Sequence, residues 1–239
     1  TTTLPTWLSF NTSTKVLSGT PLNEHVGSNS VVLTVSDGTV TVEQSFTISV
    51  ANVNDLPVFT STATTSATED VAYNYTVTAS DDDGDDLTFV ATTLPTWLSF
   101  DTNTKVLSGT PLNAHVGSNS VVLTVSDGTV TIEPQSFTIT VENVNDAPVF
   151  TSTPIEKAIL NIDYGITTGY TVTASDDDGN TLTFAATTVP SWLSFDTNTK
   201  VLSGTPTTLG HKEENNTVTL TVSDGIASDE QEFTITVEA

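Results

Sequence analysis

The sequence repeats itself, and this property constrains the fold more than any other. Residues 92–133 closely match residues 2–43, and a third copy begins with TTVPSWLSFDTNTKVLSGTP. The tryptophans of the three copies, Trp7, Trp97 and Trp192, lie 90 and 95 residues apart. A repeat of this length is long enough for one small domain per copy, so we expect a row of similar domains.

A motif that closes each copy predicts where these domains begin and end. The letters NVND, with a proline two residues later, end one copy and start the next. They predict a partial repeat at 1–54 and whole repeats at 55–145 and 146–239. The first copy lacks a counterpart of residues 55–91. Either the sequence is cut within a repeat, which is the simpler explanation, or residues 1–54 borrow the missing strands from a neighbour.

The apolar residues alternate with polar ones along short segments. In AYNYTVTAS, for example, Tyr73, Tyr75 and Val77 share one face, and Asn74 and Thr76 share the other. Threonine and valine favour such pleated, half-buried surfaces, and no segment has a convincing apolar period of 3.6 residues. Short strands interrupted by Gly, Pro, Asn and Asp, in units of about 90 residues, predict an all-β protein made of tandem β-sandwiches.

The charge of the chain limits its partners. Five lysines, no arginine and 29 acidic residues give a formal net charge of −24. We therefore expect no nucleic acid as a partner, because its phosphates require a basic surface, whereas cations are attracted. No apolar run is long enough for a membrane span, and cysteine is absent. Hydrophobic residues make up 36% of the chain and are regularly placed, which argues against disorder.

The acidic residues are concentrated in turns. ASDDDGDDLTF at 79–89 returns as ASDDDGNTLTF at 174–184, and each copy repels itself unless water or a cation compensates. Asp176 and Asp178 lie two residues apart at a strand end, so their carboxylates share one side. The linker that begins the third repeat adds side-chain oxygens, and Asp224 ends another strand. Ca²⁺ takes six to eight oxygen ligands in irregular geometry, so this pattern predicts a calcium-stiffened joint.

Two other interpretations of these aspartates are open. They could form solvated turns, since Asp and Gly are common turn residues, although this does not account for the Asn-rich linker. An EF-hand loop needs glycine sixth and glutamate twelfth from its first aspartate. Counted from Asp81, glycine is fourth and position 92 is threonine, so the EF-hand pattern fails.

Several motifs together resemble those of known repeats. D/N-x-N-D-x-P between units, the acidic pair in ATED and D-x-D-G after a strand resemble the calcium motifs of cadherin repeats. LP-x-WLSF-D-x-x-T-x-x-LSGTP resembles the dystroglycan-type cadherin-like domain of large bacterial surface proteins. The resemblance implies tandem Ig-like or cadherin-like β-sandwiches of about 90–95 residues. It implies Ca²⁺ ligands at the first junction among Asn52, Asn54, Asp55, Asp81, Asp83 and Asp127. At the second junction it implies Glu69, Asn143, Asn145, Asp146, Asp176, Asp178 and Asp224.

The chain also departs from the cadherin pattern. Asn52 and Asn143 stand where cadherins usually have aspartate, and the LDRE motif is missing. His25 and His115 precede VG where this family often has aspartate. The third repeat has no ED pair, and Asp163 is the predicted shifted substitute. These departures imply fewer ions per junction than in cadherins.

Nothing in the sequence predicts an enzyme. The chain has no cysteine, and its histidines, His25, His115 and His211, are expected in loops without partners. The tryptophans could stack on sugar rings at the surface, but we expect them in the sandwich cores, because tryptophan is usually well buried.

The predicted function is mechanical. The repeats would form part of a long, calcium-stiffened extracellular stalk of a bacterial adhesin, on the cell surface or secreted. Their partners would be neighbouring repeats and a surface or matrix polysaccharide or another surface protein. The alternatives are a Ca²⁺-dependent polysaccharide-binding module and an accessory region of a secreted hydrolase.

Overall fold

The computed structural model describes residues 3–132, 134–165, 169–212 and 215–238. The protein is almost all β, with 50% of the residues in strands and 4% in helices, which confirms the predicted fold class. Among the described residues, no helix is long and apolar enough to cross a membrane. The chain divides into two compact units: Thr1–Ala67, Ala72–Thr110 and Ser118–Thr140 form the first, and Thr68–Val71, Pro111–Gly117 and Val141–Ala239 form the second.

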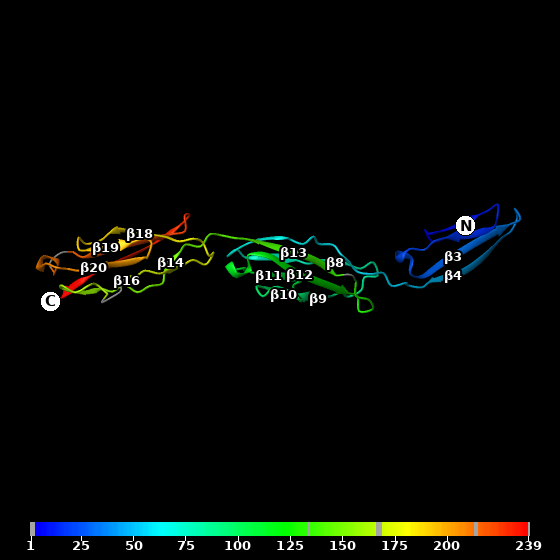
Figure 1. The fold of residues 1–239 in the computed structure, drawn as a ribbon. Helices are drawn as coiled ribbons and strands as arrows, with labels where there is room; N and C mark the ends of the chain where they lie inside the picture. Colours follow the sequence, from blue (N-terminus) through cyan, green and yellow to red (C-terminus); the bar gives the residue numbers. More distant parts are fainter. Residues whose placement is uncertain (1–2, 133, 166–168, 213–214, 239) are drawn as a thin grey trace. The chain divides into compact units, whose positions relative to one another are not determined.

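The middle repeat builds its sandwich mainly from a four-stranded sheet, ordered β6-β13-β12-β9, and a three-stranded sheet, ordered β10-β11-β7 (Figure 1). A short β5-β8 pair completes it. Its elements are β5 (Val58–Phe59), β6 (Ser66–Thr68), β7 (Tyr73–Thr76), β8 (Ala79–Ser80), β9 (Thr88–Thr93), β10 (Leu98–Asp101), β11 (Val106–Gly109), the 3-10 turn η2 (Asn113–His115), β12 (Gly117–Ser126) and β13 (Gln135–Glu142).

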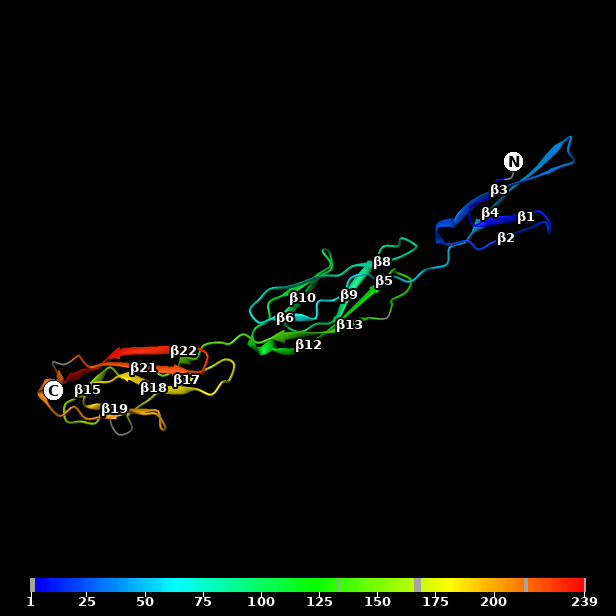
Figure 2. The same cartoon turned by 90° about the horizontal axis from the view of Figure 1, so that it is seen from above.

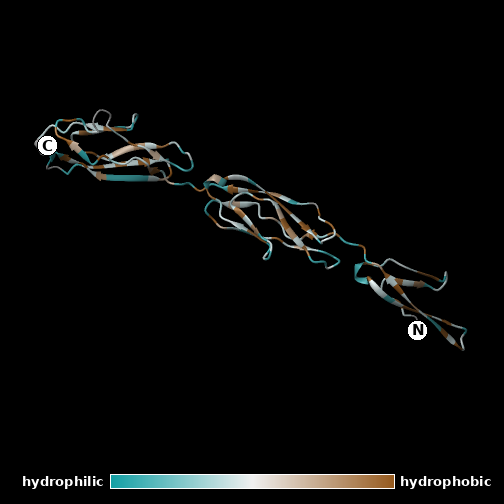
Figure 3. Cartoon of the chain, turned by 90° about the horizontal axis from the view of Figure 1, so that it is seen from below, coloured by the Kyte–Doolittle hydropathy of each residue, from teal (hydrophilic) through white to brown (hydrophobic). Residues whose placement is uncertain are grey.

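Burial in the middle repeat follows the predicted alternation. Tyr73, Tyr75 and Val77 are buried, while Asn74 and Thr76 are exposed. The same alternation gives the strands their striped hydropathy in Figure 3.

Trp97 lies in the core of this repeat and is only 9% exposed. Its ring meets Tyr73 edge-on at 5.7 Å between centroids. Its indole Nε1 donates a hydrogen bond to Asn119 Oδ1 at 3.0 Å. The prediction that this tryptophan is a core residue is confirmed.

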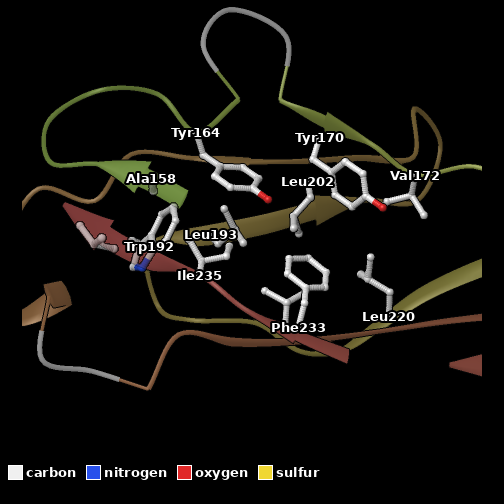
Figure 4. Close-up of a cluster of buried hydrophobic side chains, with 12 residues drawn as sticks. Ala158, Tyr164, Tyr170, Val172, Trp192, Leu193, Leu202, Leu220, Phe233 and Ile235 are labelled. Carbon is white, nitrogen blue, oxygen red and sulfur yellow. The ribbon is translucent and has the colours of Figure 1, made fainter. Parts of the chain in front are cut away.

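The C-terminal repeat has the same design. Its sheets are ordered β16-β20-β19, β18-β21-β22, β15-β23 and β14-β17. Figure 4 shows its core, in which Trp192 meets Tyr164 at 6.0 Å and Tyr170 meets Phe233 at 6.0 Å. Its elements are β14 (Val149–Phe150), β15 (Lys157–Ile159), β16 (Tyr170–Thr171), β17 (Ala174–Ser175), β18 (Thr183–Thr188), β19 (Leu193–Asp196), β20 (Val201–Gly204), η3 (Leu209–Lys212), β21 (Thr217–Ser223), β22 (Ser228–Thr234) and β23 (Thr236–Glu238).

The N-terminal repeat consists of two hairpins, β1-β2 and β3-β4, and one 3-10 turn (Figure 2). Leu8 and Val31 are its buried hydrophobic residues within the described part of the chain. Its elements are β1 (Leu8–Asn11), β2 (Val16–Gly19), η1 (Asn23–His25), β3 (Gly27–Ser36) and β4 (Thr41–Val50).

The expectation that the histidines lie in loops without partners is wrong. Each belongs to a 3-10 turn, and its ring nitrogen Nδ1 accepts a backbone N–H bond. His25 accepts from Leu22 at 2.9 Å, and His115 accepts from Leu112 at 2.9 Å. His211 accepts from Thr207 at 3.2 Å in the same way. The imidazole thus acts as a turn-closing acceptor, which a neutral histidine supplies as readily as an aspartate would.

Candidate metal centres

Each acidic turn folds so that alternate aspartates face inward. After β8, Asp81 Oδ1 accepts the backbone N–H of Asp83 at 2.9 Å, and the Asp81 carbonyl accepts that of Gly84 at 3.2 Å. Gly84 has φ +78°, a left-handed conformation that glycine adopts without strain. Asp81 and Asp83 are therefore partly buried, and Asp82 between them is exposed.

The C-terminal repeat builds its acidic turn in the same way. Asp176 Oδ1 accepts the N–H of Asn180 at 3.0 Å, and the Asp176 carbonyl accepts that of Gly179 at 3.2 Å. Gly179 has φ +72°. Asp176 and Asp178 are partly buried, with Asp177 exposed between them. The repeated sequence thus produces a repeated cradle of two inward carboxylates.

The first linker is tied to the first cradle. The backbone N–H of Asp55 donates to Asp83 Oδ2 at 2.6 Å, and Asn54 Nδ2 donates to Asp127 Oδ2 at 2.8 Å. Carboxylate oxygens of Asp81, Asp83 and Asp85 lie within 4.8 Å of one another. We call these last three residues the first acidic cluster.

The second linker makes the matching bonds. The N–H of Asp146 donates to Asp178 Oδ2 at 2.8 Å, and Asn145 Nδ2 donates to Asp224 Oδ2 at 2.8 Å. Glu69 is 2% exposed, and its Oε2 accepts the N–H of Val144 at 3.0 Å. Carboxylate oxygens of Glu69, Asp146 and Asp178 lie within 4.8 Å of one another and form the second acidic cluster.

Four carboxylate oxygens in the cradles are buried without a hydrogen-bond partner among the described residues. They are Asp81 Oδ2, Asp83 Oδ1, Asp176 Oδ2 and Asp178 Oδ1. A buried polar atom without a partner costs free energy, and a buried charge costs more. The same two positions are unsatisfied in both repeats, and the acidic residues grouped with them offer further carboxylate oxygens, which are hard ligands. These residues therefore fit a bound Ca²⁺ ion.

The electrostatics separate two kinds of aspartate. Loss of solvation, followed by the neighbouring Asp81 and Asp83, raises the pKa of Asp85. Loss of solvation, followed by Glu69 and Asp178, raises the pKa of Asp146. Both carboxylates lie close to other negative charges, which raise their pKa. A bound cation would act in the opposite direction and lower it.

Asp127 and Asp224 show the opposite shift. The side-chain hydrogen bond from Asn54 and the backbone bond from Val130 lower the pKa of Asp127. The side-chain bond from Asn145 and the backbone bond from Ala227 do the same for Asp224. Hydrogen-bond donors already satisfy these two carboxylates, so they anchor the linker.

Most of the residues predicted at the junctions come together, but not all of them. Asn52 and Asn143 are exposed, and within the described residues their side chains make no hydrogen bond to either cluster. Asn54 and Asn145 use their amide nitrogens to hold an aspartate. Asp85 is not among the ligands that the resemblance implies; it joins the first cluster while its side chain stays exposed.

The predicted role of Asp163 as a shifted substitute for the ED pair stays a prediction, because neither described cluster lies at the junction that would follow the third repeat. Asp163 accepts a hydrogen bond from Thr205 and lies in neither cluster. The backbone identifies Leu160 as the counterpart of Glu69. The N–H of Glu69 donates to the carbonyl of Glu142, and the N–H of Leu160 donates to the carbonyl of Glu238, both at 2.9 Å. In each repeat the next residue, Asp70 or Asn161, has a left-handed backbone conformation. The C-terminal repeat therefore has an apolar side chain where the middle repeat has an acid.

A side-chain amide was also missed in the sequence. Asn23 donates to the carbonyl of Asp82, and Asn113 donates to the carbonyl of Asp177. Both asparagines stand in the recurring letters TPLN, at the start of η1 and η2. The recurrence is visible in the sequence, but their contact with an acidic turn some 60 residues later is not.

Sandwich repeats of this kind, with acidic turns beside their linkers, belong to the Ig-like and cadherin-like class. More specifically, the chain belongs to the family described as "Putative Ig domain", whose model matches residues 1–51, 56–142 and 147–238. The solved structure of protocadherin gammaB7 EC3-6 is similar to this chain, with a TM-score of 0.51 and 16% sequence identity. The match covers 100% of this chain and 68% of the protocadherin chain. This likeness shows the fold.

Two further similarities are to a bacterial adhesin and to a hydrolase. The "Serine-rich adhesin for platelets" of Staphylococcus aureus strain MRSA252 is 32% identical over 134 residues, which is 56% of this chain and 10% of that protein. The chain thus spans about a tenth of the length of this relative. The endo-fucoidan hydrolase MfFcnA4 from glycoside hydrolase family 107 is 29% identical, covering 99% of this chain and 38% of that chain, with a TM-score of 0.39.

Proposed function

We propose that this chain is a series of dystroglycan-type cadherin-like repeats that Ca²⁺ stiffens, forming part of the extracellular stalk of a bacterial surface adhesin. The observation that carries the proposal is the pair of buried, unpartnered carboxylate oxygens that recurs in both acidic turns. The proposed role is mechanical rather than catalytic, because the same acidic turn recurs in the middle and C-terminal repeats instead of one repeat presenting a centre of its own.

The residues that would hold the ion differ between the junctions. At the second, Glu69, Asp146, Asp176 and Asp178 would supply carboxylate oxygens. At the first, Asp81, Asp83 and Asp85 would do so. Bound Ca²⁺ supplies positive charge that offsets the repulsion among these groups. Because the linker N–H groups already bond to the cradle aspartates, fixing the carboxylates would also fix the linker.

The relatives support a role in adhesion at a surface. One is named as an adhesin for platelets, and the protocadherin gammaB7 structure has the same fold. For this chain we propose neighbouring repeats as the constant partners and a surface polysaccharide or another surface protein as the ligand.

Calcium titration of the whole chain tests the proposal. Millimolar Ca²⁺ should raise the melting temperature relative to EDTA, by mass action on the native state, and Mg²⁺ should do so less because it demands octahedral geometry. Small-angle scattering should show that the chain samples a narrower range of maximum dimensions in Ca²⁺ than in EDTA. The double variant Asp176→Asn, Asp178→Asn should lose part of both effects with its far-UV circular dichroism unchanged.

Equal melting curves and scattering profiles in Ca²⁺ and EDTA would leave the aspartates as solvated turns. Binding to a glycan array that depends on Ca²⁺, without any change in dimensions, would instead favour the polysaccharide-binding module.

A further inference from the structure

The middle repeat reaches the acidic turn that follows it with two side chains, Glu69 and Asn113. Glu69 offers a carboxylate to the second acidic cluster, and Asn113 donates its amide N–H to the backbone carbonyl of Asp177. We propose that Asn113 is a positioning residue of the second junction. Its bond holds the acidic turn in place without metal, so the joint is partly ordered before any ion binds.

The two side chains differ in what they need from a cation. Carboxylate oxygens of Glu69 and Asp178 lie within 4.8 Å of each other, so they repel unless positive charge lies close by. A backbone carbonyl only accepts hydrogen bonds, and the amide of asparagine donates one without carrying charge. The bond from Asn113 to the carbonyl of Asp177 therefore forms with or without Ca²⁺.

The same contact recurs at the first junction. There Asn23 donates to the carbonyl of Asp82. Both asparagines are partly buried, and both stand last in the letters TPLN, whereas the C-terminal repeat has TPTT at this place. In each case the donor and the acceptor belong to the same compact unit. The contact is therefore a property of the repeat and not of one linker.

A turn with its own hydrogen bonds presents Asn113. The N–H of Leu112 donates to His115 Nδ1 at 2.9 Å, and the N–H of His115 donates back to the carbonyl of Leu112 at 2.8 Å. The N–H of Val116 donates to the carbonyl of Asn113 at 3.1 Å. The backbone of Asn113 is thus fixed on both sides, which lets a short side chain aim at one acceptor.

This turn is joined to the segment that carries Glu69. The N–H of Asp70 donates to the carbonyl of Pro111 at 2.9 Å, two residues before Asn113. The N–H of Glu69 donates to the carbonyl of Glu142 at 2.9 Å. Because Asn113 and Glu69 are held to one backbone framework, the bond from Asn113 also sets where the Glu69 carboxylate meets the acidic turn.

The carbonyl that accepts this bond lies between the two cradle aspartates. In the first turn the peptide that joins Asp82 to Asp83 is held at both ends. Its carbonyl accepts from Asn23, and its N–H donates to Asp81 Oδ1 at 2.9 Å. The oxygens that stay unpartnered in this turn are Asp81 Oδ2 and Asp83 Oδ1. The asparagine bond therefore orients the peptide from which the two cradle carboxylates project.

One consequence rests on the proposed function. A turn that is already held in place loses less freedom when an ion binds, so Asn113 should raise the Ca²⁺ affinity of the second junction. The net contribution of one neutral hydrogen bond corresponds to roughly twofold to tenfold in affinity. The metal-free order of the joint does not depend on this consequence and is tested separately.

Distances between spin labels test that order in the whole chain. The chain has no cysteine, so Asn103→Cys and Asn198→Cys place one label on an exposed turn of the middle repeat and one on the equivalent turn of the C-terminal repeat. In EDTA, electron double resonance should give a narrower distance distribution for this chain than for the same chain with Asn113→Thr. Threonine removes the amide donor and occurs naturally in TPTT, so η2 should stay folded.

Three further variants separate the hydrogen bond from the mere presence of a side chain. Asn113→Asp keeps the shape but sets a charged acceptor against a carbonyl, so in EDTA it should broaden the distribution at least as much as Asn113→Thr. Asn113→Gln keeps the donor and should retain part of the narrowing. Ala114→Ser, at the exposed neighbour in the same turn, should behave like the parent. An unchanged indole N–H of Trp97 in ¹⁵N spectra checks that the core of the middle repeat is intact.

The outcomes distinguish this proposal from the calcium proposal. Equal distributions for the parent and Asn113→Thr in EDTA would overturn the role of Asn113, and narrowing of both by Ca²⁺ would still support the proposed function. Broadening by Asn113→Thr in EDTA, with no effect of Ca²⁺ on any chain, would support Asn113 and overturn the calcium proposal.

Calorimetry measures the consequence for the metal. In a chain with Asp81→Asn and Asp83→Asn, which leaves the second junction to bind Ca²⁺, Asn113→Thr should weaken binding by roughly twofold to tenfold. An unchanged affinity beside a broader distance distribution would show that the Asn113 bond holds the joint but does not position the ligands.

Discussion

The N-terminal and middle repeats share almost the same residues from β1 to β3 and from β10 to β12, yet they differ in how those residues are used. Trp97 is buried against Tyr73, whereas Trp7 is partly exposed, with His25 as its described ring neighbour at 6.2 Å. The alternating pattern thus determines which face can be buried. Whether it is buried depends on a segment elsewhere in the chain.

The largest expected effect comes from truncating the two equivalent tryptophans. Trp97→Ala should destabilise the middle repeat by about 3–5 kcal/mol, the usual cost of removing a buried aromatic ring. Trp7→Ala should lower the free energy of unfolding by less than about 2 kcal/mol, because the partly exposed Trp7 ring buries less apolar area than Trp97 does. Urea denaturation followed by far-UV circular dichroism measures both. Equal losses would mean that the N-terminal repeat has a core as complete as that of the middle repeat.

The two acidic clusters differ in the same way as the two repeats. Both have the turn, the linker bonds and the two unpartnered oxygens, but only the second includes a glutamate from the repeat before it. Glu69 is available there because residues 68–71 are present and bonded to Glu142 and Pro111. The number of ligands at a junction therefore depends on the end of the preceding repeat as well as on the acidic turn.

A single substitution tests this difference. Glu69→Gln should weaken Ca²⁺ binding at the second junction about tenfold, equivalent to roughly 1.4 kcal/mol, and should leave the first junction unchanged. The fold should survive, since glutamine can still accept the N–H of Val144. Calorimetric titration with Ca²⁺ measures the affinities.

Asp70→Asn is the matched control for that experiment. Asp70 is exposed, has φ +59° and has asparagine as its counterpart in the C-terminal repeat, Asn161 with φ +60°. The Asp70→Asn chain should bind Ca²⁺ only slightly more weakly than the parent chain, because Asp70 lies outside the second acidic cluster although its charge also acts on Asp146. A Glu69→Gln chain that binds like the parent would remove Glu69 from the proposed ligands.

Much of the fold could be predicted because the pattern is local. Period-two alternation placed Tyr73, Tyr75 and Val77 in the core, and the repeat spacing gave the class. The acidic turns were equally visible, because Asp81 and Asp83 bond within a few residues of each other.

What the sequence concealed depends on residues that are distant along the chain. Asn23 and Asn113 reach acidic turns in the following repeat. Asn54 and Asn145 turn their amide nitrogens toward an aspartate and so hold the linker in place, a role that composition alone does not distinguish from metal ligation. The exposed Asn52 and Asn143 look the same in the sequence because they lie two residues away in the same motif.

The smallest expected effect concerns the turn between β10 and β11. Backbone bonds from Asn103 and Thr104 lower the pKa of Asp101 below its usual value. A carboxylate with a lowered pKa adds stability above its unfolded pKa of about 3.9, and this contribution is lost as the pH falls through the folded pKa. In the N-terminal repeat, Asn11 makes the equivalent bonds to Ser13 and Thr14 without a charge.

Asp101→Asn should therefore keep the turn and change the urea midpoint only slightly at pH 7, because the amide oxygen accepts the same two bonds. Between about pH 5 and pH 2 the variant should lose less stability than the parent chain, since its turn no longer titrates. Asp101→Ala is the contrasting variant, because it removes the acceptor and should weaken the turn at every pH. Urea midpoints measured across this range distinguish the three chains. If Asp101→Asn and the parent lose stability in parallel as the pH falls, the charge of Asp101 contributes nothing to the turn, and Asn11 and Asp101 are equivalent despite their different chemistry.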